Sequence, residues 1–441
     1  MPHNRDWLVS PSLVVGSSDV LTPNTVSYPH TEAGRPMKIA LCYPSVLPQR
    51  GGCETYIARL CHRLVCDGHE VHLFAWRWDA KALPAELCFH PIELPLRPRF
   101  LRPWYFTYAC REQLRRTEHD VSIGFDKIAG VDVYYPQGGD YEASVTLSLS
   151  KHSSRLWRYL LSLTKWLDPA HLSFRALDRR QYNQTDSLVL AISDMVRRHL
   201  IEDRGVPADR VVVLPIAAPV RPVCTEAEPA IRQRFRDQWQ LPNSSVVALF
   251  AGMNYRLKGL VPLLHAMSRL RDQSLHLVVA GQSSHFWFRH LARRLGIFDK
   301  VRFIGYCPQM QEAYLAADLL VHPTFYDPCS NVVLEALAYG LPVITTTRNG
   351  ASELLSSSAT PHYGWGRPAI VGACPAGFVL DDPHDDARLA EALAMLLSAE
   401  RRANCAAAAR TLAACWTFEH HYQRLVEILT QARRQSHRRA A

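Results

Sequence analysis

Short apolar runs alternate with helical patterns along most of this chain, and this alternation constrains its fold more than any other feature. The run at 38–43 leads into a glycine-containing loop at 51–54, and the helical pattern after it ends at Asp67-Gly68, a typical helix stop. A second apolar run occupies 71–75. A strand, a loop, a helix and another strand form a βαβ unit, which requires a parallel sheet. The sequence therefore predicts an α/β fold.

The same alternation fills two separate stretches of the chain. Further buried strands are expected at 121–125, 187–192, 211–214, 246–251, 275–280, 301–304, 319–322 and 342–345. The segment 215–229 between the two stretches holds four prolines, which indicates an interdomain linker. We expect two doubly wound, Rossmann-like domains that face each other, with the ligand in the cleft at the carboxyl ends of the strands.

Composition and charge narrow the class of protein. We predict a disordered leader at 1–36, an N-terminal domain at 37–222, a C-terminal domain at 223–415, an amphipathic helix at 416–432 and a basic tail at 433–441. The leader lacks the features of a signal peptide, and no apolar run approaches the ~20 residues of a membrane span. The 12 cysteines are scattered without a Cys-x-x-Cys pair, which favours a reducing cytoplasm. The net charge of +9 suggests an anionic partner.

The most informative segment places two carboxylates around the start of a helix. Asp327 stands in a loop, and Glu335 lies on the helix after it. Backbone N–H groups at a helix start have no partner within the helix, and the helix dipole favours an anion there. We expect a diphosphate to bind at this end, with the carboxylates accepting hydrogen bonds from sugar hydroxyls on either side. The N–H groups concerned belong to Ser330, Asn331, Val332 and Val333.

Two glycine-rich loops supply further candidates for phosphate binding. The first follows the strand 246–251 and runs from Gly252 to Gly259, with the cations Arg256 and Lys258 between them. Glycine lets a phosphate approach the backbone, and cations neutralise its charge. The second loop, Gly51-Gly52, is by itself a weak signal, because diglycines are frequent in turns.

Together these motifs resemble the retaining glycosyltransferases of the GT-B fold, family 4, over residues 38 to about 429. The segment from Asp327 to Glu335 is similar to the E-x7-E region of that family, with Asp327 in place of the usual glutamate. The resemblance implies that Asp327 holds hydroxyls of the donor sugar and that Glu335 holds the ribose of the nucleotide. It also implies an acceptor-side N-terminal domain, a nucleotide-sugar-binding C-terminal domain, and a last helix that crosses back onto the N-terminal domain.

The resemblance assigns roles to the glycine-rich loops as well. Lys258 matches the phosphate-binding lysine of the family, whereas Met253 stands where the family has an arginine. Arg256 is either a substitute for that arginine or a solvated loop cation. The loop Gly51-Gly52 is similar to one that meets the donor phosphates from across the cleft. Glu54 falls where the family carries an acidic or amide residue near the acceptor, although a glutamate favoured by the helix dipole is the alternative.

The loop after the strand 121–125 points to a subgroup of the family. It carries Asp126-Lys127 where many members have a histidine close to the transferred sugar. This loop and the following stretch 130–134 are similar to the subgroup that adds glucose to the inner-core heptose of lipopolysaccharide. The resemblance implies that Asp126 and Lys127 act near the sugar. A surface ion pair of little energetic value is the alternative.

No Asp-x-Asp sequence occurs, so the metal-chelating signature of the other common glycosyltransferase fold is missing. We therefore expect neither a metal nor a cofactor. The charge of the leaving diphosphate would then be balanced by Lys258 and the helix dipole. Arg256 would contribute as well if it substitutes for the missing arginine. Because no protein base is evident, our hypothesis is that the departing phosphate oxygen removes the proton of the acceptor hydroxyl.

Two segments, 97–116 and 151–180, combine cations with aromatic side chains. This combination suits an anionic membrane surface or a phosphorylated, lipid-linked acceptor. The alternative is a solvated basic face above core aromatics. We expect no nucleic-acid partner, because no recognised binding fold accompanies the charge. We expect a cytoplasmic protein that binds peripherally at the cytoplasmic face of the inner membrane.

The sequence therefore predicts a retaining, metal-independent glycosyltransferase. It would move a hexose, glucose from UDP-glucose, onto a cell-envelope glycolipid such as a lipopolysaccharide core. Two alternatives stay open. One is a nucleotide-sugar 2-epimerase of the same fold. The other is a degenerate protein that binds a nucleotide or a membrane without turnover, which Met253 and Asp327 suggest.

Overall fold

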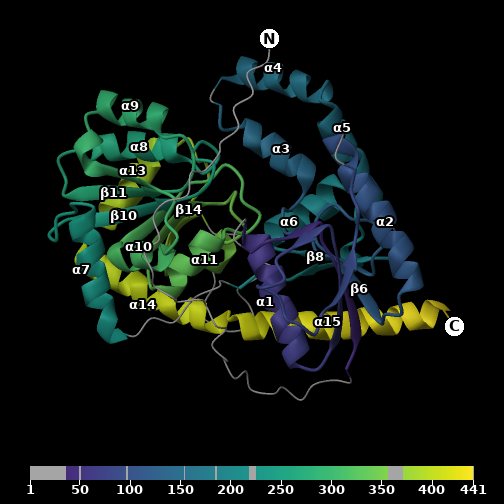
Figure 1. Cartoon of the computed structure of the whole chain (residues 1–441). Helices are drawn as coiled ribbons and strands as arrows, with labels where there is room; N and C mark the ends of the chain where they lie inside the picture. The colour runs from purple at the N-terminus through teal and green to yellow at the C-terminus, as the bar shows by residue number, and fades with distance from the viewer. Residues whose placement is uncertain are drawn as a thin grey trace, which may run out of the picture.

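The computed structural model describes residues 36–48, 51–95, 98–152, 154–183, 186–217, 225–355 and 371–440. Apart from Pro36, the predicted leader lies outside these residues, and so does the predicted domain boundary at 222/223. The chain forms two α/β units that lie beside each other (Figure 1). Each unit is built on a seven-stranded sheet, which confirms the predicted pair of Rossmann-like domains.

The N-terminal sheet is parallel throughout and has the strand order β5-β3-β1-β6-β7-β8-β9. Its strands are β1 (Lys38–Cys42), β3 (Glu70–Ala75), β5 (Cys88–Pro91), β6 (Val121–Gly124), β7 (Val133–Tyr134), β8 (Leu188–Ala191) and β9 (Val211–Val213). A separate pair joins β2 (Ser45–Val46) to β4 (Arg77–Trp78). All five strands predicted in this half form, whereas β5 and β7 were not predicted.

The C-terminal sheet repeats this arrangement with the order β12-β11-β10-β13-β14-β16-β15. Its strands are β10 (Val246–Ala251), β11 (Leu275–Ala280), β12 (Val301–Gly305), β13 (Leu319–His322), β14 (Val343–Thr346), β15 (Gly372–Cys374) and β16 (Gly377–Leu380). Only β15 pairs antiparallel among these strands. In both sheets the first strand is central and the next two lie on one side of it, so the sheets are doubly wound.

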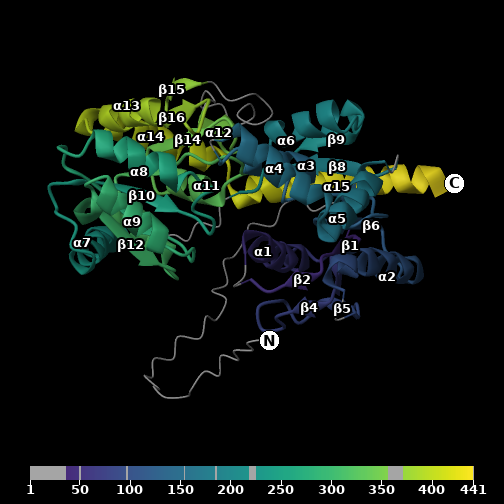
Figure 2. The ribbon, with the colours of Figure 1, turned by 90° about the horizontal axis from the view of Figure 1, so that it is seen from above.

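Helices cover both sheets, and the two units are seen apart from above in Figure 2. The N-terminal unit contains α1 (Gly52–Cys66), α2 (Arg102–Arg116), α3 (Tyr141–Leu149), α4 (Arg155–Trp166), α5 (Pro169–Tyr182) and α6 (Asp194–Arg198). The C-terminal unit contains α7 (Glu228–Gln238), α8 (Leu260–Arg269), α9 (Phe286–Arg294), α10 (Met310–Ala316), α11 (Asn331–Ala338), α12 (Ser352–Leu355), α13 (Asp386–Met395) and α14 (Ala399–Cys415). The described residues contain no helix that combines the length and the apolar composition of a bilayer span.

The last helix, α15 (Phe418–Ala440), lies along the N-terminal unit (Figure 1). The Arg63 guanidinium pairs with Glu419 at 3.0 Å, and the Tyr56 hydroxyl lies 2.7 Å from Nε2 of His421. Residues 433–440, which we expected as a loose tail, continue this helix. One reason is that Arg433 still pairs with Asp120 on the N-terminal unit at 3.0 Å.

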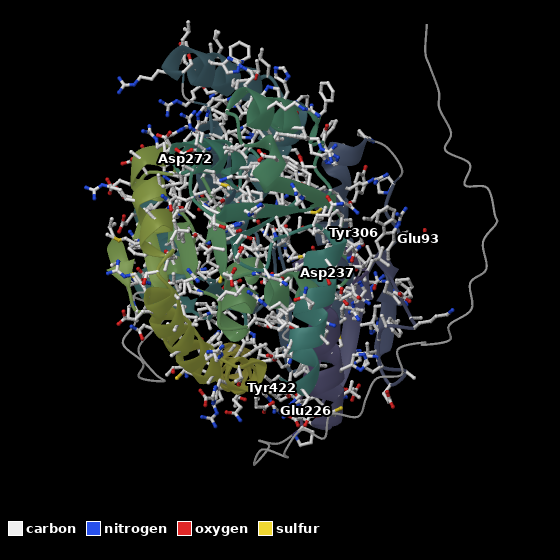
Figure 3. All side chains as sticks on the ribbon, turned by 90° about the vertical axis from the view of Figure 1, so that its left-hand side faces the viewer. Glu93, Glu226, Asp237, Asp272, Tyr306 and Tyr422 are labelled. Atoms are coloured by element: carbon white, nitrogen blue, oxygen red, sulfur yellow. The ribbon has the colours of Figure 1, made fainter. Side chains whose placement is uncertain are left out.

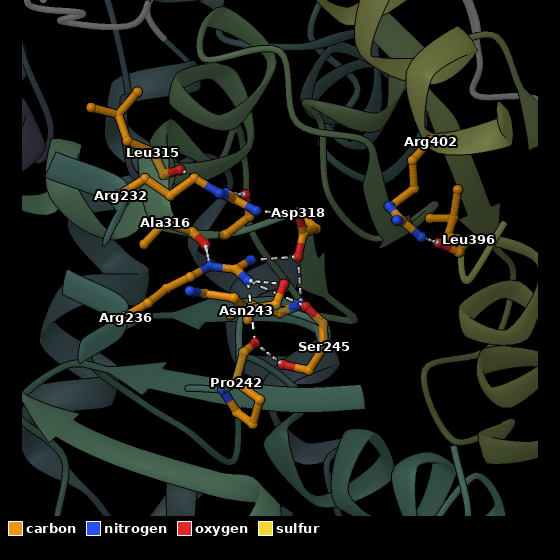
Figure 4. Close-up of polar contacts among 12 residues, drawn as sticks. Arg232, Arg236, Pro242, Asn243, Ser245, Leu315, Ala316, Asp318, Leu396 and Arg402 are labelled. Carbon is orange, nitrogen blue, oxygen red and sulfur yellow. Dashed lines mark hydrogen bonds and ion pairs between the residues drawn. The ribbon is translucent and has the colours of Figure 1, made fainter. Parts of the chain in front are cut away.

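A partly buried ion network fixes α7 to the C-terminal sheet (Figure 4). The Asp318 carboxylate accepts from Arg232 at 2.6 Å, from Arg236 at 2.8 Å and from the backbone N–H of Val247 at 2.7 Å. Because α7 begins at Glu228, the expected linker 215–229 ends within this helix, and its residues 218–224 lie outside the described part of the chain. Figure 3 views this unit from its outer side, with Asp237 near the end of α7.

Candidate active site between the two domains

A cavity of about 340 Å³ lies between the two units. Its walls come from loops that follow the carboxyl ends of β1, β6, β7, β8 and β9 on one side, and of β10 and β13 on the other. Eight of the predicted site residues line it, namely Gly52, Asp126, Gly252, Lys258, Asp327, Ser330, Asn331 and Val332. Ligands of doubly wound sheets bind at this edge, so the cavity is the candidate active site.

Asp327 and Lys258 form an ion pair in the wall of the cavity. Lys258 Nζ lies 2.6 Å from Asp327 Oδ2, and Nε2 of His322, the last residue of β13, lies 3.6 Å from the same oxygen. Burial alone would raise the pKa of Asp327, but the charge of Lys258 and the contact with His322 outweigh it and hold that pKa well below its ordinary value. The carboxylate is therefore ionised at neutral pH and ready to accept hydrogen bonds.

The loop that carries Lys258 depends on a glycine. Gly259 has φ of 85°, a left-handed conformation, and a side chain there would run into the backbone carbonyl of Pro323. This close approach places Lys258 next to the end of β13. On the other side of Lys258, a side chain at Gly252 would meet its Cγ at 2.9 Å. Because neither glycine has a side chain, the Lys258 side chain can pack close to the backbone and extend to the cavity wall.

Two helix starts meet at the cavity. Helix α11 begins after Ser330 without a side-chain cap, and in the described part of the chain the N–H groups of Asn331 and Val332 have no acceptor. Helix α1 begins at Gly52 opposite, also without a side-chain cap, and a side chain on Gly52 would collide with the amide of Asn331. Uncapped helix starts carry partial positive charge, so the cavity favours an anionic group.

Three buried polar atoms around the cavity have no hydrogen-bond partner among the residues that the structure describes. They are Nε2 of Gln137, Nδ1 of His322 and Oδ1 of Asn331, and all three residues line the wall. Leaving such an atom unsatisfied costs about 1–3 kcal/mol. Three of them around one cavity indicate a polar ligand that supplies both donors and acceptors.

Glu335 lies one turn into α11 and outside the wall of this cavity. Its Oε2 accepts a hydrogen bond of 2.6 Å from the hydroxyl of Tyr314 on α10. Burial raises the pKa of Glu335 to about 7, and the Tyr314 hydroxyl opposes this rise. The carboxyl group therefore titrates near neutrality. It sits on the same helix as the N–H groups of Asn331 and Val332, one turn further from the cavity.

Asp126 and Lys127 adopt an unusual backbone conformation and diverge. Their φ angles are 53° and 45°, in the left-handed region that non-glycine residues rarely occupy. Asp126 lines the cavity, and burial raises its pKa although Lys127 opposes the rise. Lys127 points away, with Nζ 4.4 Å from the ring centre of Phe174 on α5. The structure thus brings only Asp126 to the cavity.

Several other predicted residues lie outside the cavity wall. The exposed Arg256 stacks on Trp287 with its guanidinium 4.3 Å from the ring centre, and it lines a different cavity. Glu54 folds back over Gly51 at the start of α1. Neither residue reaches the cavity between the two units in this conformation. The remaining predicted residues outside the wall are Gly51 and the buried Val333.

Sequence reasoning missed Tyr43, Gln137 and His322, which all line the cavity. His322 had a readable signal, since it is a polar residue at the carboxyl end of an apolar strand. Gln137 had none, because it follows the two-residue strand β7, which the sequence did not reveal.

Contacts across the cleft hold the two units together beside this site. The Ser193 hydroxyl donates to the carbonyl of Pro328 at 2.8 Å. The Glu353 carboxylate accepts from the backbone N–H groups of Asp194 and Met195, each at 2.8 Å. The neighbour of Asp327 is therefore bonded to the N-terminal unit, and the cavity is seen in a closed arrangement.

Comparison with known proteins identifies both halves of the chain. Residues 50–218 match the family described as "Glycosyltransferase Family 4", and residues 231–412 match "Glycosyl transferases group 1". The lipopolysaccharide glucosyltransferase WaaG of Escherichia coli (strain K12) is 25% identical over 333 residues, which cover 73% of this chain and 83% of that protein.

Solved structures share the fold. The crystal structure of WaaG superposes with a TM-score of 0.68 at 22% identity, over 89% of this chain and 99% of that one. The Anabaena protein Alr3699/HepE in complex with UDP-glucose superposes with a TM-score of 0.61 at 17% identity, over 90% of this chain and 100% of that one. At these identities the superpositions establish a shared fold and no more.

Proposed function

The chain belongs to the glycosyltransferases of group 1 and family 4, with the GT-B fold, and we propose that it moves a hexose from a UDP-sugar to a cell-envelope glycolipid with retention of configuration and without a metal ion. The observation that carries the proposal is the Lys258–Asp327 pair beside the uncapped start of α11. A cation and free N–H groups meet a diphosphate there, and an ionised carboxylate meets a sugar.

The geometry supports an electrostatic mechanism. Lys258 and the N–H groups of Asn331 and Val332 stabilise the charge that develops on the leaving diphosphate. Asp327 accepts hydroxyls of the donor sugar while Lys258 turns toward the phosphate. Asp126, in the opposite wall, is available to a sugar hydroxyl. The departing phosphate oxygen takes the proton of the acceptor hydroxyl, which attacks the same face of the sugar.

A second cavity supports an anionic, partly apolar acceptor. It measures about 400 Å³ and is lined by Trp104, Tyr105, Tyr108, Arg111 and Arg180, among others. Among the described residues no carboxylate forms an ion pair with Arg111 or Arg180, since the nearby Glu112 and Glu142 pair with Arg115 and Arg179. Its floor reaches the loop behind the donor cavity, because Ala129 lines it and Thr107 of α2 donates to the carbonyl of Lys127 at 3.4 Å.

Helix α4 supports a position at a membrane surface. None of its residues is buried, and its apolar side chains include Leu156, Trp157 and Leu163, which are 69%, 53% and 45% exposed. Arg155, Arg158 and Lys165 share the helix. An apolar face flanked by cations suits the interface of an anionic bilayer, where a glycolipid acceptor would reside. Glucose and lipopolysaccharide are the sugar and acceptor that WaaG suggests for this chain.

Purified protein incubated with a panel of radiolabelled UDP-hexoses and a deacylated lipopolysaccharide core tests this function. We expect transfer from UDP-glucose that persists in excess chelator, with an α-linked product by NMR. A thermal-shift panel with UDP should show stabilisation that Lys258→Ala and Glu335→Ala reduce. Binding without turnover on every donor and acceptor would instead support the degenerate alternative. Turnover that requires added Mg²⁺ or Mn²⁺ would contradict the metal-independent mechanism.

A further inference from the structure

Side chains that ligate metals gather on two neighbouring strands at the edge of the N-terminal sheet, away from the active site. Glu70 and His72 belong to β3, and Cys88 and His90 belong to β5. The register pairs His72 with Cys88 and Phe74 with His90. Because alternate residues of a strand share a face, the four side chains lie on the same face of this edge.

Their contacts already have the form of a metal site. Nε2 of His72 lies 3.0 Å from Oε1 of Glu70, and Nδ1 of His72 lies 2.9 Å from Nε2 of His90. The ligand atoms of Glu70, His72 and Cys88 all lie within 4.8 Å of one another. His72 is buried, whereas Glu70 and Cys88 are exposed, so a cation can enter from solvent.

We propose that Glu70, His72 and Cys88 bind a zinc ion, with water as the fourth ligand and His90 as the residue that orients His72. A thiolate, an imidazole and a carboxylate together favour zinc over magnesium or calcium, which prefer oxygen ligands alone. With the metal on Nε2 of His72, its Nδ1–H donates to Nε2 of His90. Metal-bound histidines characteristically donate their other ring N–H in this way.

The geometry needs only a small adjustment. Donor atoms around tetrahedral zinc lie about 3.3–3.8 Å apart, as bond lengths of about 2.0–2.3 Å require. The present limit of 4.8 Å therefore calls for an inward shift of about 1 Å by Glu70 and Cys88, whose exposed side chains can make it. The nearby cation Lys38 lies 3.9 Å from Glu70 but 2.8 Å from Glu118, so its closer partner stays available when a metal takes Glu70.

The ion would act as a structural clip. Strand β5 is the edge strand, has four residues and pairs only with β3 within the described sheet. A metal that joins Cys88 to His72 fastens this strand to the sheet. Glu70 begins β3, whereas the donor cavity lies beyond the carboxyl ends of the strands, so the site is separate from sugar transfer.

Titration of the metal-free full-length protein with Co²⁺ tests the proposal. We expect one equivalent of tightly bound Co²⁺ with visible d–d bands of tetrahedral coordination and a thiolate-to-cobalt charge-transfer band in the near ultraviolet, which Zn²⁺ abolishes. Cys88→Ser should remove the charge-transfer band. The matched variant Cys66→Ser, at another exposed cysteine, should keep it. His90→Ala should weaken binding about 10–100-fold, the usual effect of losing the partner of a ligating histidine.

Variants at the exposed end of the site guard against misfolding. Glu70→Gln replaces a half-exposed side chain and should weaken Co²⁺ binding at least about tenfold without a change in the circular dichroism spectrum. The proposal is overturned if the wild-type protein shows no charge-transfer band, if Cys88→Ser keeps the band, or if Glu70→Gln binds Co²⁺ as tightly as the wild type.

Discussion

Asp327 and Lys258 neutralise each other at 2.6 Å before any donor arrives. Aspartate is one methylene shorter than the glutamate usual in the family, and the short side chain meets the lysine directly in the wall of the cavity. Removing one partner of a buried ion pair costs far more stability than the intact pair contributes, because the remaining charge is left without compensation. The pair is thus a preorganised arrangement of charge. We propose that the donor divides it, with Lys258 turning to the phosphate and Asp327 to the sugar.

Replacing Lys258 should impair catalysis more than replacing Arg256, the other cation of this loop. Lys258→Ala removes the cation beside the diphosphate, and we expect kcat to fall about 10²–10³-fold, as when one preorganised donor is lost. Arg256→Ala serves as the matched control, because Arg256 stacks on Trp287 outside the cavity. Steady-state kinetics with UDP-glucose measures both. Equal losses in the two variants would show that Arg256 turns into the site during turnover.

Glu335 should make nucleotide binding depend on pH. Its pKa is raised from 4.5 to about 7, so between these values the folded chain holds a proton that the unfolded chain has lost. The contribution of this group to stability therefore decreases as pH rises through this window, and Glu335→Gln should be more stable than the wild type at pH 8. UDP affinity of the wild type should fall as pH drops through 7, because the ribose needs the carboxylate.

Calorimetric titration of UDP from pH 6 to 8, with denaturant unfolding at pH 8, checks both expectations. Glu335→Gln should bind UDP weakly at every pH in this range. Wild-type affinity that stays constant from pH 6 to 8 would contradict the assigned role of Glu335.

Residues that line the cavity could be predicted from the sequence where their own short segment of chain also fixes their position. Asp327 and Asn331 belong to a single loop and helix start, and Lys258 is fixed by Gly259 beside it. Arg256 and Lys127 lie outside the cavity wall because each contacts aromatic side chains from distant parts of the chain, which a linear motif does not reveal.

The C-terminus of α7 contains a residue, Gln240, whose backbone conformation would suit glycine better. Helix α7 ends at Gln238, and Gln240 then adopts φ of 51°, the left-handed conformation of a helix C-terminus. The backbone N–H of Leu241 bonds to the carbonyl of Arg236 at 2.8 Å, which closes the terminal motif. Glycine adopts this conformation without the steric cost of a β-carbon.

Gln240→Gly should therefore stabilise the protein by about 1 kcal/mol, since the left-handed conformation costs other residues about 1–2 kcal/mol. Gln233→Gly, at an exposed position in the middle of the helix, should destabilise it by about 1 kcal/mol. Urea unfolding measures both changes. If Gln240→Gly does not stabilise the protein, the glutamine side chain makes contacts that offset the cost of its left-handed conformation.

Helix α4 should direct the protein to anionic bilayers. We expect the wild type to pellet with anionic vesicles in a salt-sensitive way, because each cation near the surface contributes about 1 kcal/mol. Leu156→Ser with Leu163→Ser should reduce pelleting several-fold. Met395→Ser, at an exposed apolar residue of the other domain, is the control. Equal pelleting with neutral vesicles would defeat the prediction.

Elements with long apolar runs were predictable, and short ones were not. The strands β10 and β11 have six residues each and stand out from their flanking glycines. Strand β7 has two residues, and β5 ends in a proline, so neither carries a pattern of its own. Both form because neighbouring strands offer them hydrogen bonds, a tertiary effect that local sequence does not encode.

The two domains as a whole are joined across the cleft by Glu353. Its carboxylate accepts two backbone N–H groups from the start of α6, and burial raises its pKa while these donors oppose the rise. An amide can accept only through its single oxygen, so Glu353→Gln should lose one of these bonds and destabilise the closed arrangement by about 1–3 kcal/mol.

Small-angle scattering should then detect a larger radius of gyration for Glu353→Gln, and KM for the donor should rise several-fold. Glu391→Gln, on the exposed surface of α13, provides a control that changes charge alone. An unchanged radius together with an unchanged KM would show that other contacts close the cleft.

The path of α15 governs how the protein is made. Tyr422, Leu425 and Ile428 complete the same hydrophobic core as Ile57 and Leu60, although more than 350 positions separate them. On the ribosome, the first domain emerges long before the helix that covers it. That domain can finish folding only after α15 has been synthesised, and until then its uncovered apolar surface is prone to aggregation.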